Sequence, residues 1–417
     1  MSNFINYANS FQAVARLELE CIKRLCDILG NPQNDLKFIH IAGTNGKGSV
    51  CAMLQTALSH AGYKTGKYTS PNLISVCERI SIDGVDITNS ELEKIMAQVQ
   101  KGADIIHNES GSYPTQFELW TAAAFLYFKE QKTDIVVLET GLGGERDATN
   151  VIPTPLASVI TPISFDHISY LGNDIKGIAQ AKAGIIKGPK GVTVCANQPP
   201  EIMEVIEKKA FETNNELIVA NKIESKSISG IYEVFDFGDI KDIACGLGGI
   251  HQLENASISI TVLKKLGINN DSIKYGISNA KNPARFEILS KQPLVIFDGA
   301  HNLSGAQVLA ESLKRYFKDE KFTFVCAFME DKDYSSMIEL FAPFANRFVA
   351  TEVPENPRAL SAKKLAETIE KSGITASYNS SVFAALDNAI SDEKIVICGS
   401  LYLYSFIKDY FSQNPLQ

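Results

Sequence analysis

The stretch LKFIHIAGTNGKGSVCAMLQTALSHAG, residues 36–62, contains the clearest folding unit of the chain. Phe38 to Ile41 form a short apolar run that is typical of a buried strand, and a glycine-rich turn follows it. After the turn, apolar side chains recur at the spacing of one helix face, at Val50, Met53, Leu54, Ala57 and Leu58. Gly62 is suited to end that helix. The stretch therefore predicts a strand, a glycine-rich loop and a helix in direct succession.

Apolar strand-like runs alternate with amphipathic helical stretches along most of the chain. Beyond the first unit, such runs are DIVVLE at 134–139, LASVIT at 156–161 and GVTVCA at 191–196. The alternation restarts after residue 290 with PLVIFDGAHN, FTFVCAF, NRFVATEV and EKIVICGSLYLY. Strands that alternate with helices indicate mainly parallel sheets joined by right-handed crossovers. We expect an α/β protein, with an N-terminal P-loop NTPase-like domain around a mainly parallel sheet and a smaller C-terminal Rossmann-like domain.

The chain has 417 residues, enough for two or three domains of about 150 residues each. The segment AKNPARFE at 280–287 contains an Asn-Pro break just before the alternation restarts, which makes it the best candidate for a linker. We expect a first domain over 1–281, a linker over 282–288 and a second domain over 289–417. The segment 213–245 is less patterned, and the sequence leaves its structure open.

The composition excludes several classes of protein. Lys and Arg number 40 and Asp and Glu 48, for a net charge of -8. There are no basic runs, so we expect no nucleic-acid partner, because phosphate neutralisation needs clustered cations. No apolar run reaches the about 20 residues that span a bilayer, and the first residues lack a signal-peptide core. The eight cysteines are scattered without a C-x-x-C pair, as in reduced proteins. We expect a soluble cytoplasmic protein.

The glycine-rich turn is the sharpest local signal for a binding site, and its residues are Gly43, Thr44, Asn45, Gly46, Lys47, Gly48 and Ser49. Glycines let backbone N–H groups approach a ligand, the following helix N-terminus favours an anion, and Lys47 adds a positive charge. Ser49 could reach a Mg²⁺ held by phosphates. The match to G-x-x-x-x-G-K-[ST] is incomplete, because position 41 is Ile and Ser follows Lys by two residues. The alternative is an ordinary strand-to-helix turn.

Carboxylates and imidazoles stand where other predicted strands end. Glu139 ends DIVVLE, and Asp166 and His167 follow the next strand. Asp298 ends another apolar run, with His301 three residues later. Ligands bind at the carboxyl edge of parallel sheets, so these side chains are candidates for a site. The alternatives are an exposed strand-end Glu and a structural His.

Lys182 is unusual because it falls on an apolar helix face with Ile175, Ile178, Ala179 and Ile185. That spacing turns its ammonium inward, where burial would lower the amine pKa and favour the neutral, reactive form. The alternative is a lysine that snorkels along its aliphatic stem to the surface.

The loop GTNGKGS resembles the nucleotide loop of the Mur ligase superfamily, and in particular of its folylpolyglutamate synthase and bifunctional dihydrofolate synthase members. The resemblance extends in order over most of the chain. It covers GNPQNDLKFIHIAGTNGKGSV, TSPNLISVCERISIDG, PTQFELWTAAAFLYF, LETGLGGERDATN, FDHISYLGNDIKGIAQAKAGIIK, HQLENA, NPARFE, FDGAHN, DKD and ICGSLYLY. Two departures are Glu145-Arg146, where the family has GLGGR-x-DATN, and Leu303, where it commonly has Pro.

The resemblance implies a set of site residues. Mg²⁺ ligands would be Ser70, Glu139 and His167, joined by a carbamate that CO₂ forms on Lys182. ATP would meet the loop residues 43–49 and, across the domain junction, Asn255, Arg285, Asp298 and His301. Lys182, His167, Asp298 and His301 would take part in catalysis. Arg285 has the shape and permanent charge for phosphate, and its alternative is a linker residue paired with a carboxylate.

The implied activity is an ATP-dependent amide ligase. ATP would phosphorylate the terminal carboxylate of tetrahydrofolate, and L-glutamate would attack the acyl phosphate. The first domain would be the ATP-binding central domain, the second the glutamate-ligase domain, and closure about the linker would assemble the site. We expect a monomer with a folate and L-glutamate as substrates. Whether dihydropteroate is also a substrate stays open.

Three alternatives compete with this activity. A peptidoglycan ligase uses similar chemistry but carries a further domain before the loop, and only 42 residues precede Gly43 here. A P-loop kinase or switch GTPase explains the loop but not the second block with Asp298 and His301. A nucleotide-binding protein without ligase activity predicts binding without folate-stimulated ADP release.

Overall fold

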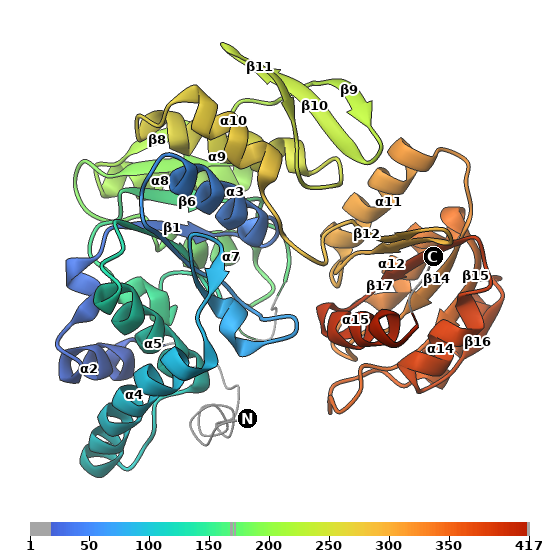
Figure 1. The fold of residues 1–417 in the computed structure, drawn as a ribbon, viewed down its shortest axis with the longest axis horizontal. Coiled ribbons are helices and arrows are strands. Elements are labelled where there is room, and N and C mark those ends of the chain that lie inside the picture. The colour runs from blue at the N-terminus through green and yellow to red at the C-terminus, as the bar shows by residue number, and fades with distance from the viewer. Residues whose placement is uncertain (1–17, 167–169, 171, 415–417) are drawn as a thin grey trace. The chain divides into compact units, whose positions relative to one another are not determined.

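The protein was analysed as a computed structural model that describes residues 18–166, 170 and 172–414 (Figure 1). The chain forms two compact units. The N-terminal unit contains the residues up to Glu224 together with Phe235–Ile243 and Leu253–Ala280. The C-terminal unit contains Ser225–Val234, Ala244–Gln252 and the residues from Lys281 onward.

The N-terminal unit is built on an eight-stranded sheet with the order β4-β3-β2-β5-β1-β6-β7-β8. The strands are β1 (Phe38–Ala42), β2 (Thr65–Tyr68), β3 (Ile80–Ile82), β4 (Val85–Asp86), β5 (Ile135–Glu139), β6 (Ala157–Ile160), β7 (Val192–Cys195) and β8 (Glu216–Val219). Strands β2, β5, β1, β6, β7 and β8 run parallel, and β3 and β4 add an antiparallel edge. The predicted mainly parallel sheet is confirmed, with β1 at its centre and buried along its whole length.

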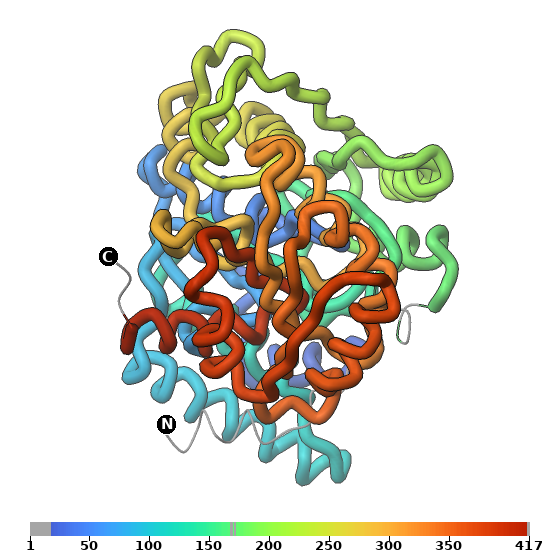
Figure 2. Tube along the Cα trace, turned by 90° about the vertical axis from the view of Figure 1, so that its right-hand side faces the viewer, coloured from blue at the N-terminus to red at the C-terminus, as the bar shows by residue number. Residues whose placement is uncertain are grey.

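Helices cover this sheet, namely α2 (Glu20–Ile28), α3 (Lys47–His60), α4 (Asn89–Ser110), α5 (Gln116–Glu130), α7 (Ile175–Ala183), α8 (Pro200–Glu212), α9 (Gln252–Lys265) and α10 (Asn270–Asn279). The long cyan helix of Figure 2 is α4. Both α4 and α5 begin at capping boxes, formed by Thr88 with Glu91 and by Thr115 with Glu118. These residues explain where the two helices start.

Helix α3 begins and ends close to where the sequence predicts, but it is buried on more than the one predicted face. Positions outside the predicted apolar face, such as Cys51, Ala52 and Gln55, are also buried. The reason is a second packing partner, because a Cβ at Gly276 of α10 would lie 2.3 Å from the Cβ of Ala57. Helix α3 is therefore enclosed between the sheet and α10.

The C-terminal unit contains a six-stranded sheet with the order β12-β13-β17-β14-β15-β16. The strands are β12 (Glu287–Lys291), β13 (Leu294–Phe297), β14 (Phe322–Cys326), β15 (Ala345–Ala350), β16 (Ala376–Tyr378) and β17 (Lys394–Cys398). All neighbours are parallel except β12 with β13. Its helices are α11 (Leu303–Phe317), α12 (Tyr334–Phe341), α13 (Ala362–Lys371), α14 (Val382–Ala389) and α15 (Tyr404–Gln413). The predicted smaller α/β block is confirmed.

The segment that the sequence left open, 213–245, contains β8 of the large sheet and then a three-stranded sheet, β9 (Ser225–Ser229), β10 (Tyr232–Phe237) and β11 (Ile240–Ala244). The unit boundaries fall inside this sheet, after Val234 and after Ile243. The predicted first domain, 1–281, therefore contains two segments, 225–234 and 244–252, that group with the C-terminal residues.

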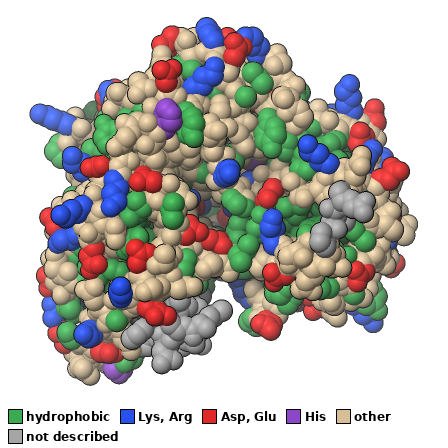
Figure 3. All heavy atoms as spheres, in the orientation of Figure 1, with side chains coloured by type: hydrophobic (Ala, Val, Ile, Leu, Met, Phe, Trp, Pro, Cys, Tyr) green, Lys and Arg blue, Asp and Glu red, His purple; other side chains and the backbone are tan. Residues whose placement is uncertain are grey.

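Charged side chains of both signs are interspersed on the face drawn in Figure 3. Among the residues that the structure describes, no helix is long and apolar enough to cross a bilayer.

Candidate active site

The glycine-rich loop follows β1 and takes backbone conformations that need glycine. Gly43 has a φ of +149° and Gly46 a φ of +89°. A Cβ at Gly43 would lie 1.9 Å from Oγ1 of Thr161, and one at Gly46 would lie 2.4 Å from Oδ1 of Asn255. The loop thus passes directly against Thr161 and brings Asn255 of α9 into contact with it, as no larger residue would allow.

The loop is anchored to the segment that follows β6. The backbone N–H groups of Thr44 and Asn45 donate to the carbonyl of Pro162, at 2.9 and 3.3 Å. Oγ1 of Thr44 donates to the carbonyl of Ser164 at 2.9 Å and accepts from its N–H at 3.0 Å. These two backbone N–H groups hold the loop in place, so the first turn of α3, from Lys47, is the part that can offer N–H groups to an anion.

Two lysine ammonium groups converge on one carbonyl of the loop. Nζ of Lys47 donates to the carbonyls of Gly43 and Thr44, both at 3.1 Å. Nζ of Lys182, on α7, donates to the same Gly43 carbonyl at 2.8 Å. Lys182 is only 4% exposed, so the surface-lysine interpretation is wrong. Burial, reinforced by the charge of Lys47, lowers the pKa of Lys182 to about 7 although Asp166 opposes the shift.

Glu139 and Ser70 meet at the ends of two neighbouring strands. Glu139 ends β5 and is 5% exposed, so the exposed strand-end alternative is wrong. The N–H of Ser70, just after β2, donates to Oε2 of Glu139 at 3.2 Å. The charge of Glu139 also contributes to the raised pKa of Cys51 in α3, after the larger effect of burial. The predicted carboxylate therefore lies near the helix that starts at the loop.

The third predicted metal ligand, His167, lies outside the described residues. Its neighbour Asp166 is buried, and its charge acts on Lys182. Within the described ranges there is no cluster of three or more His, Cys, Asp or Glu side chains arranged to hold a metal ion.

In the C-terminal unit, Asp298 organises the backbone around the end of β13. Its Oδ2 accepts from the N–H of Phe286 and its Oδ1 from that of Ala300, both at 2.8 Å. Ala284 and Phe286 have φ values of +63° and +43°, and the N–H of Gly299 donates to the carbonyl of Ala284 at 2.9 Å. Burial raises the pKa of Asp298, which is 8% exposed, while the nearby Arg285 opposes the shift.

Arg285 and two histidines share this part of the C-terminal unit. A Cβ at Gly299 would lie 2.8 Å from Nη1 of Arg285. Nδ1 of His301 donates to the carbonyl of Gly299 at 2.8 Å, which fixes its tautomer. His251, which the sequence did not single out, has its pKa lowered to about 4 by burial and by Arg285. Its Nε2 accepts from Nε2 of Gln252 at 2.9 Å.

Comparison with known proteins relates both units to one family. The chain matches the Mur ligase middle domain over residues 41–263 and the Mur ligase glutamate ligase domain over residues 284–401. It is 36% identical over 406 residues to a dihydrofolate synthase/folylpolyglutamate synthase of Bacillus subtilis, with 93% of each chain covered.

The chain belongs to the Mur ligase family. Within it, the chain belongs to the folylpolyglutamate synthase/dihydrofolate synthase group of ATP-dependent ligases. A folylpolyglutamate synthase of Lacticaseibacillus casei is 33% identical, with 97% of both chains covered. The solved structure of Mycobacterium tuberculosis folylpolyglutamate synthase, complexed with ADP and AMPPCP, superposes with a TM-score of 0.89. It is 32% identical, over 96% of this chain and 97% of that one. The kinase or GTPase alternative is therefore wrong.

One departure from the family sequence has a structural description. In GLGGERDATN, the side chains of Glu145 and Arg146 are exposed, whereas Asp147 is buried and accepts from the N–H of Leu142 at 2.7 Å. The displaced arginine therefore lies on the surface of this Mur ligase.

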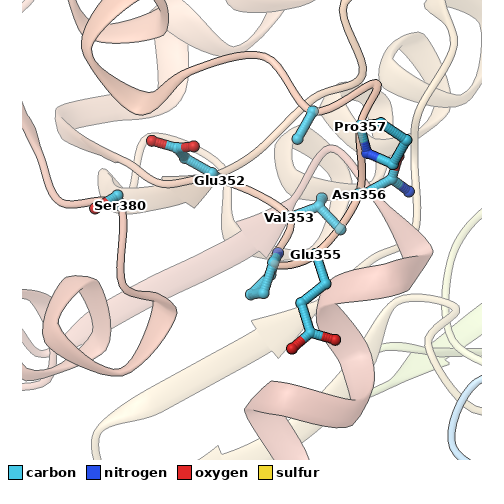
Figure 4. A pocket seen from close by; sticks show the side chains of 8 residues that line it. Glu352, Val353, Glu355, Asn356, Pro357 and Ser380 are labelled. Carbon is cyan, nitrogen blue, oxygen red and sulfur yellow. The ribbon is translucent and has the colours of Figure 1, made fainter.

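A hollow of about 460 Å³ in the C-terminal unit is lined by none of the predicted site residues. It lies beyond the end of β15, between residues such as Glu352, Glu355 and Ser380 (Figure 4). Oε1 of Glu352 accepts from the N–H of Ala362 at 3.3 Å, at the start of α13. The Glu352 carboxylate therefore accepts a hydrogen bond from the first turn of α13, which gives it a structural role.

Proposed function

We propose that this Mur ligase adds L-glutamate to the terminal carboxylate of tetrahydrofolate at the expense of ATP. The observation that carries the proposal is the position of Lys47, whose Nζ donates to the Gly43 and Thr44 carbonyls at the first turn of α3. A lysine at the N-terminus of a helix favours a polyphosphate, and relatives over most of the chain are named for this activity.

The chemistry needs strong neutralisation of negative charge. A carboxylate oxygen of the folate attacks the γ-phosphorus, the bond to ADP breaks, and an acyl phosphate forms. The amino group of glutamate then attacks the acyl carbon, loses a proton, and phosphate leaves. Because phosphates and carboxylate repel one another, Lys47 and the N-terminus of α3 would hold the phosphoryl oxygens as charge moves between them. Alignment of the two reactants supplies further acceleration.

Mg²⁺ would be held by Ser70, Glu139 and His167, with the carbamate of Lys182. The described part of this set consists of oxygen donors, the type that Mg²⁺ prefers, and Ser70 and Glu139 lie together. When bound, the ion would neutralise charge on the phosphates and on the developing acyl phosphate.

The carbamate on Lys182 would arise when its neutral amine attacks CO₂ and releases one proton. Burial supports this step, because a pKa of about 7 leaves a large fraction of the amine neutral near pH 7. The product is an anion where the sequence shows a cation.

The remaining predicted residues would act on the nucleotide. Asn255, Arg285, Asp298 and His301 would contact ATP, and Asp298 and His301 would take part in catalysis. Arg285 supplies a permanent charge for phosphate, and Asp298 supports the backbone of Phe286 beside it. We further propose a monomer.

Formation of dihydrofolate from dihydropteroate is the second candidate activity, because the Bacillus subtilis relative is named for both. The test is ADP release with Mg-ATP and glutamate, in which tetrahydrofolate, dihydropteroate and no acceptor are compared. We expect release with tetrahydrofolate. ADP release with dihydropteroate but not with tetrahydrofolate would assign dihydrofolate formation instead. ADP release that neither acceptor stimulates would contradict both activities.

A further inference from the structure

The loop that follows β5 lies directly against the end of α7, the helix that carries Lys182. The N–H of Glu145 donates to the carbonyl of Ala181 at 2.6 Å. Nδ2 of Asn150 donates to the carbonyls of Glu145 at 2.9 Å and Gly184 at 3.2 Å. One amide group therefore connects this loop to the residues just after Lys182.

The contact is close, because glycine stands on both sides of it. A Cβ at Gly144 would lie 2.8 Å from the carbonyl oxygen of Ala181. A Cβ at Gly184 would lie 2.2 Å from the Cβ of Glu145. The Cβ and Cγ of Glu145 therefore lie against Gly184, although residue 145 as a whole is exposed. The close approach of the two segments therefore depends on glycine at 144 and 184.

Lys187 holds the other side of the same loop. Its Nζ donates to the carbonyls of Asn150 and Ile152, the latter at 2.9 Å, at the end of a short 3-10 helix, Ala148–Val151. Burial, with a smaller effect of Lys23, lowers the pKa of Lys187 to about 8. The charge of Lys187 in turn lowers the pKa of His40, after the larger effect of burial. The ammonium is thus kept at this position against a desolvation cost.

The loop is also tied to β1, the strand that leads into Gly43. Asp147 accepts from the N–H of Thr149 at 3.0 Å, and Oγ1 of Thr149 lies 2.8 Å from Nε2 of His40. His40 is fully buried in β1. The same loop therefore contacts the strand before Gly43 and the helix that presents Lys182.

We propose that Asn150 and Lys187 are positioning residues that hold Lys182 at the Gly43 carbonyl. We call the set Gly144, Glu145, Asn150 and Lys187 the clamp. The Nζ of Lys182 lies 2.8 Å from that carbonyl, and the α7 backbone sets the point from which its side chain reaches the loop. Displacements of about 1 Å at a reacting group can lower a rate about 100-fold. The proposal rests on the proposed role of Lys182 in the ligase reaction.

The test compares Asn150→Ala, which removes the bridging amide, with Lys187→Met, which removes the ammonium from the opposite side. Lys190→Met is the matched control, because Lys190 is exposed and lies three residues beyond Lys187. For each protein we would measure kcat, KM for ATP, the melting temperature, and the ¹³C signal of the Lys182 carbamate in ¹³C-bicarbonate. Hydrogen exchange of the segment 178–186 would report on the α7 end directly.

We expect both clamp variants to lose about 10-fold or more in kcat, with KM for ATP changed less than about two-fold, and to lose most of the carbamate signal. Exchange in 178–186 should speed up, and Lys190→Met should match the parent. If kcat and the carbamate signal stay normal at 25 °C while only the melting temperature falls, the clamp is structural and the proposal is wrong. If Asn150→Ala does not fold, Lys187→Met decides the same point alone.

Failure of the proposed function gives a different result. If the parent protein shows no carbamate signal and Lys182→Arg keeps full activity, the role of Lys182 is wrong. If hydrogen exchange of 178–186 is unchanged in both Asn150→Ala and Lys187→Met, these residues do not position the end of α7. That result would contradict the clamp independently of the role of Lys182.

Discussion

The carboxyl ends of β1 and β13 both carry candidate site residues, yet they shape their backbones by opposite means. At β1, the unusual conformations belong to Gly43 and Gly46, where a side chain would collide with Thr161 or Asn255. At β13, the left-handed residues are Ala284 and Phe286, which have ordinary side chains. Such conformations cost about 1 kcal/mol or more each and persist where neighbouring groups impose them. At β13 the neighbouring groups are two carboxylates: that of Asp298 accepts from the N–H of Phe286, and that of Glu287 from the N–H of Ala284.

The two edges also differ in the charge that they bury. At β1, two ammonium groups share the Gly43 carbonyl and the pKa of Lys182 is lowered. At β13, one carboxylate accepts two backbone N–H groups and its pKa is raised. We infer that Lys47 suits the β1 edge to receive an anion, whereas Asp298 first of all supports the backbone.

The largest expected effect tests the anion site at β1. Lys47→Ala should lower folate-dependent ADP release by about 100- to 1,000-fold, because a charge that faces transferring phosphate is lost. The melting temperature should stay within about 2 °C of the parent, since the Nζ of Lys47 bonds to the Gly43 and Thr44 carbonyls of its own loop and is not part of the core. Lys190→Ala is the control, and near-normal turnover of Lys47→Ala would contradict the phosphate role.

Glu139→Gln should be second in size. It keeps the shape of the side chain but replaces a charged oxygen ligand by a neutral one, so we expect about a 100-fold loss at low Mg²⁺. A Mg²⁺ titration of initial rates checks this, and partial recovery at high Mg²⁺ would indicate weakened binding. Undiminished activity at low Mg²⁺ would remove Glu139 from the proposed ligand set.

Asp298→Asn tests the support role at β13. The amide can no longer accept from both Phe286 and Ala300, so one buried N–H loses its partner. We expect the free energy of unfolding to fall by about 1–3 kcal/mol. Chemical denaturation measures this change. A variant as stable as the parent that has lost activity would show that Asp298 acts mainly on substrate.

The opposite buried charges predict opposite pH dependence. Between about pH 8 and 10 the unfolded chain keeps a proton on Lys187 that the folded protein lacks, so the parent should gain stability relative to Lys187→Met as pH rises. We expect the difference in the free energy of unfolding between the parent and Lys187→Met to grow by about 1–2 kcal/mol across this range. The pKa of Asp298 is raised, so the folded protein keeps a proton that the unfolded chain releases. The stability of the parent relative to Asp298→Asn should therefore increase as pH falls toward 4. Parallel denaturation curves at each pH check both directions.

The smallest effect is expected for Ala284→Gly. Glycine adopts a φ of +63° without penalty, and the relief offsets the entropy that it adds to the unfolded chain, so stability should change by less than about 1 kcal/mol. The exchange in the other direction, Gly43→Ala, should destabilise instead, because its Cβ would overlap Thr161. If Ala284→Gly and Gly43→Ala changed the free energy of unfolding equally, the two strand ends would not differ in how they hold their backbone conformations.

The sequence predicts the β1 edge far better than the β13 edge. Glycines, a lysine and a buried strand are visible locally, and so is the apolar face that turns Lys182 inward. Ala284 and Phe286 carry no such signal, because their backbones are held by carboxylates that follow them, Glu287 for the N–H of Ala284 and Asp298 for that of Phe286. The bond from Lys187 to Asn150 joins residues 37 apart in the chain and was missed for the same reason.

The segment 225–244 was missed for a different reason. Its three strands are short and expose many of their side chains, so hydrophobic alternation is weak. The switch of the chain between the two units at Val234 and Ile243 has no compositional marker such as proline or glycine. The metal-ligand roles predicted for Ser70 and Glu139 come from the family resemblance and not from spacing, and the structure places these two residues in contact.

The bonds from Thr44 and Asn45 to Pro162 have a thermodynamic consequence for nucleotide binding. A loop that is ordered during folding does not lose conformational entropy again when its ligand arrives. Calorimetry of ATP binding to this loop should therefore lack the large negative heat-capacity change that accompanies coupled folding. Selectivity between nucleotides would then come from side chains such as Asn255 that meet an already rigid frame.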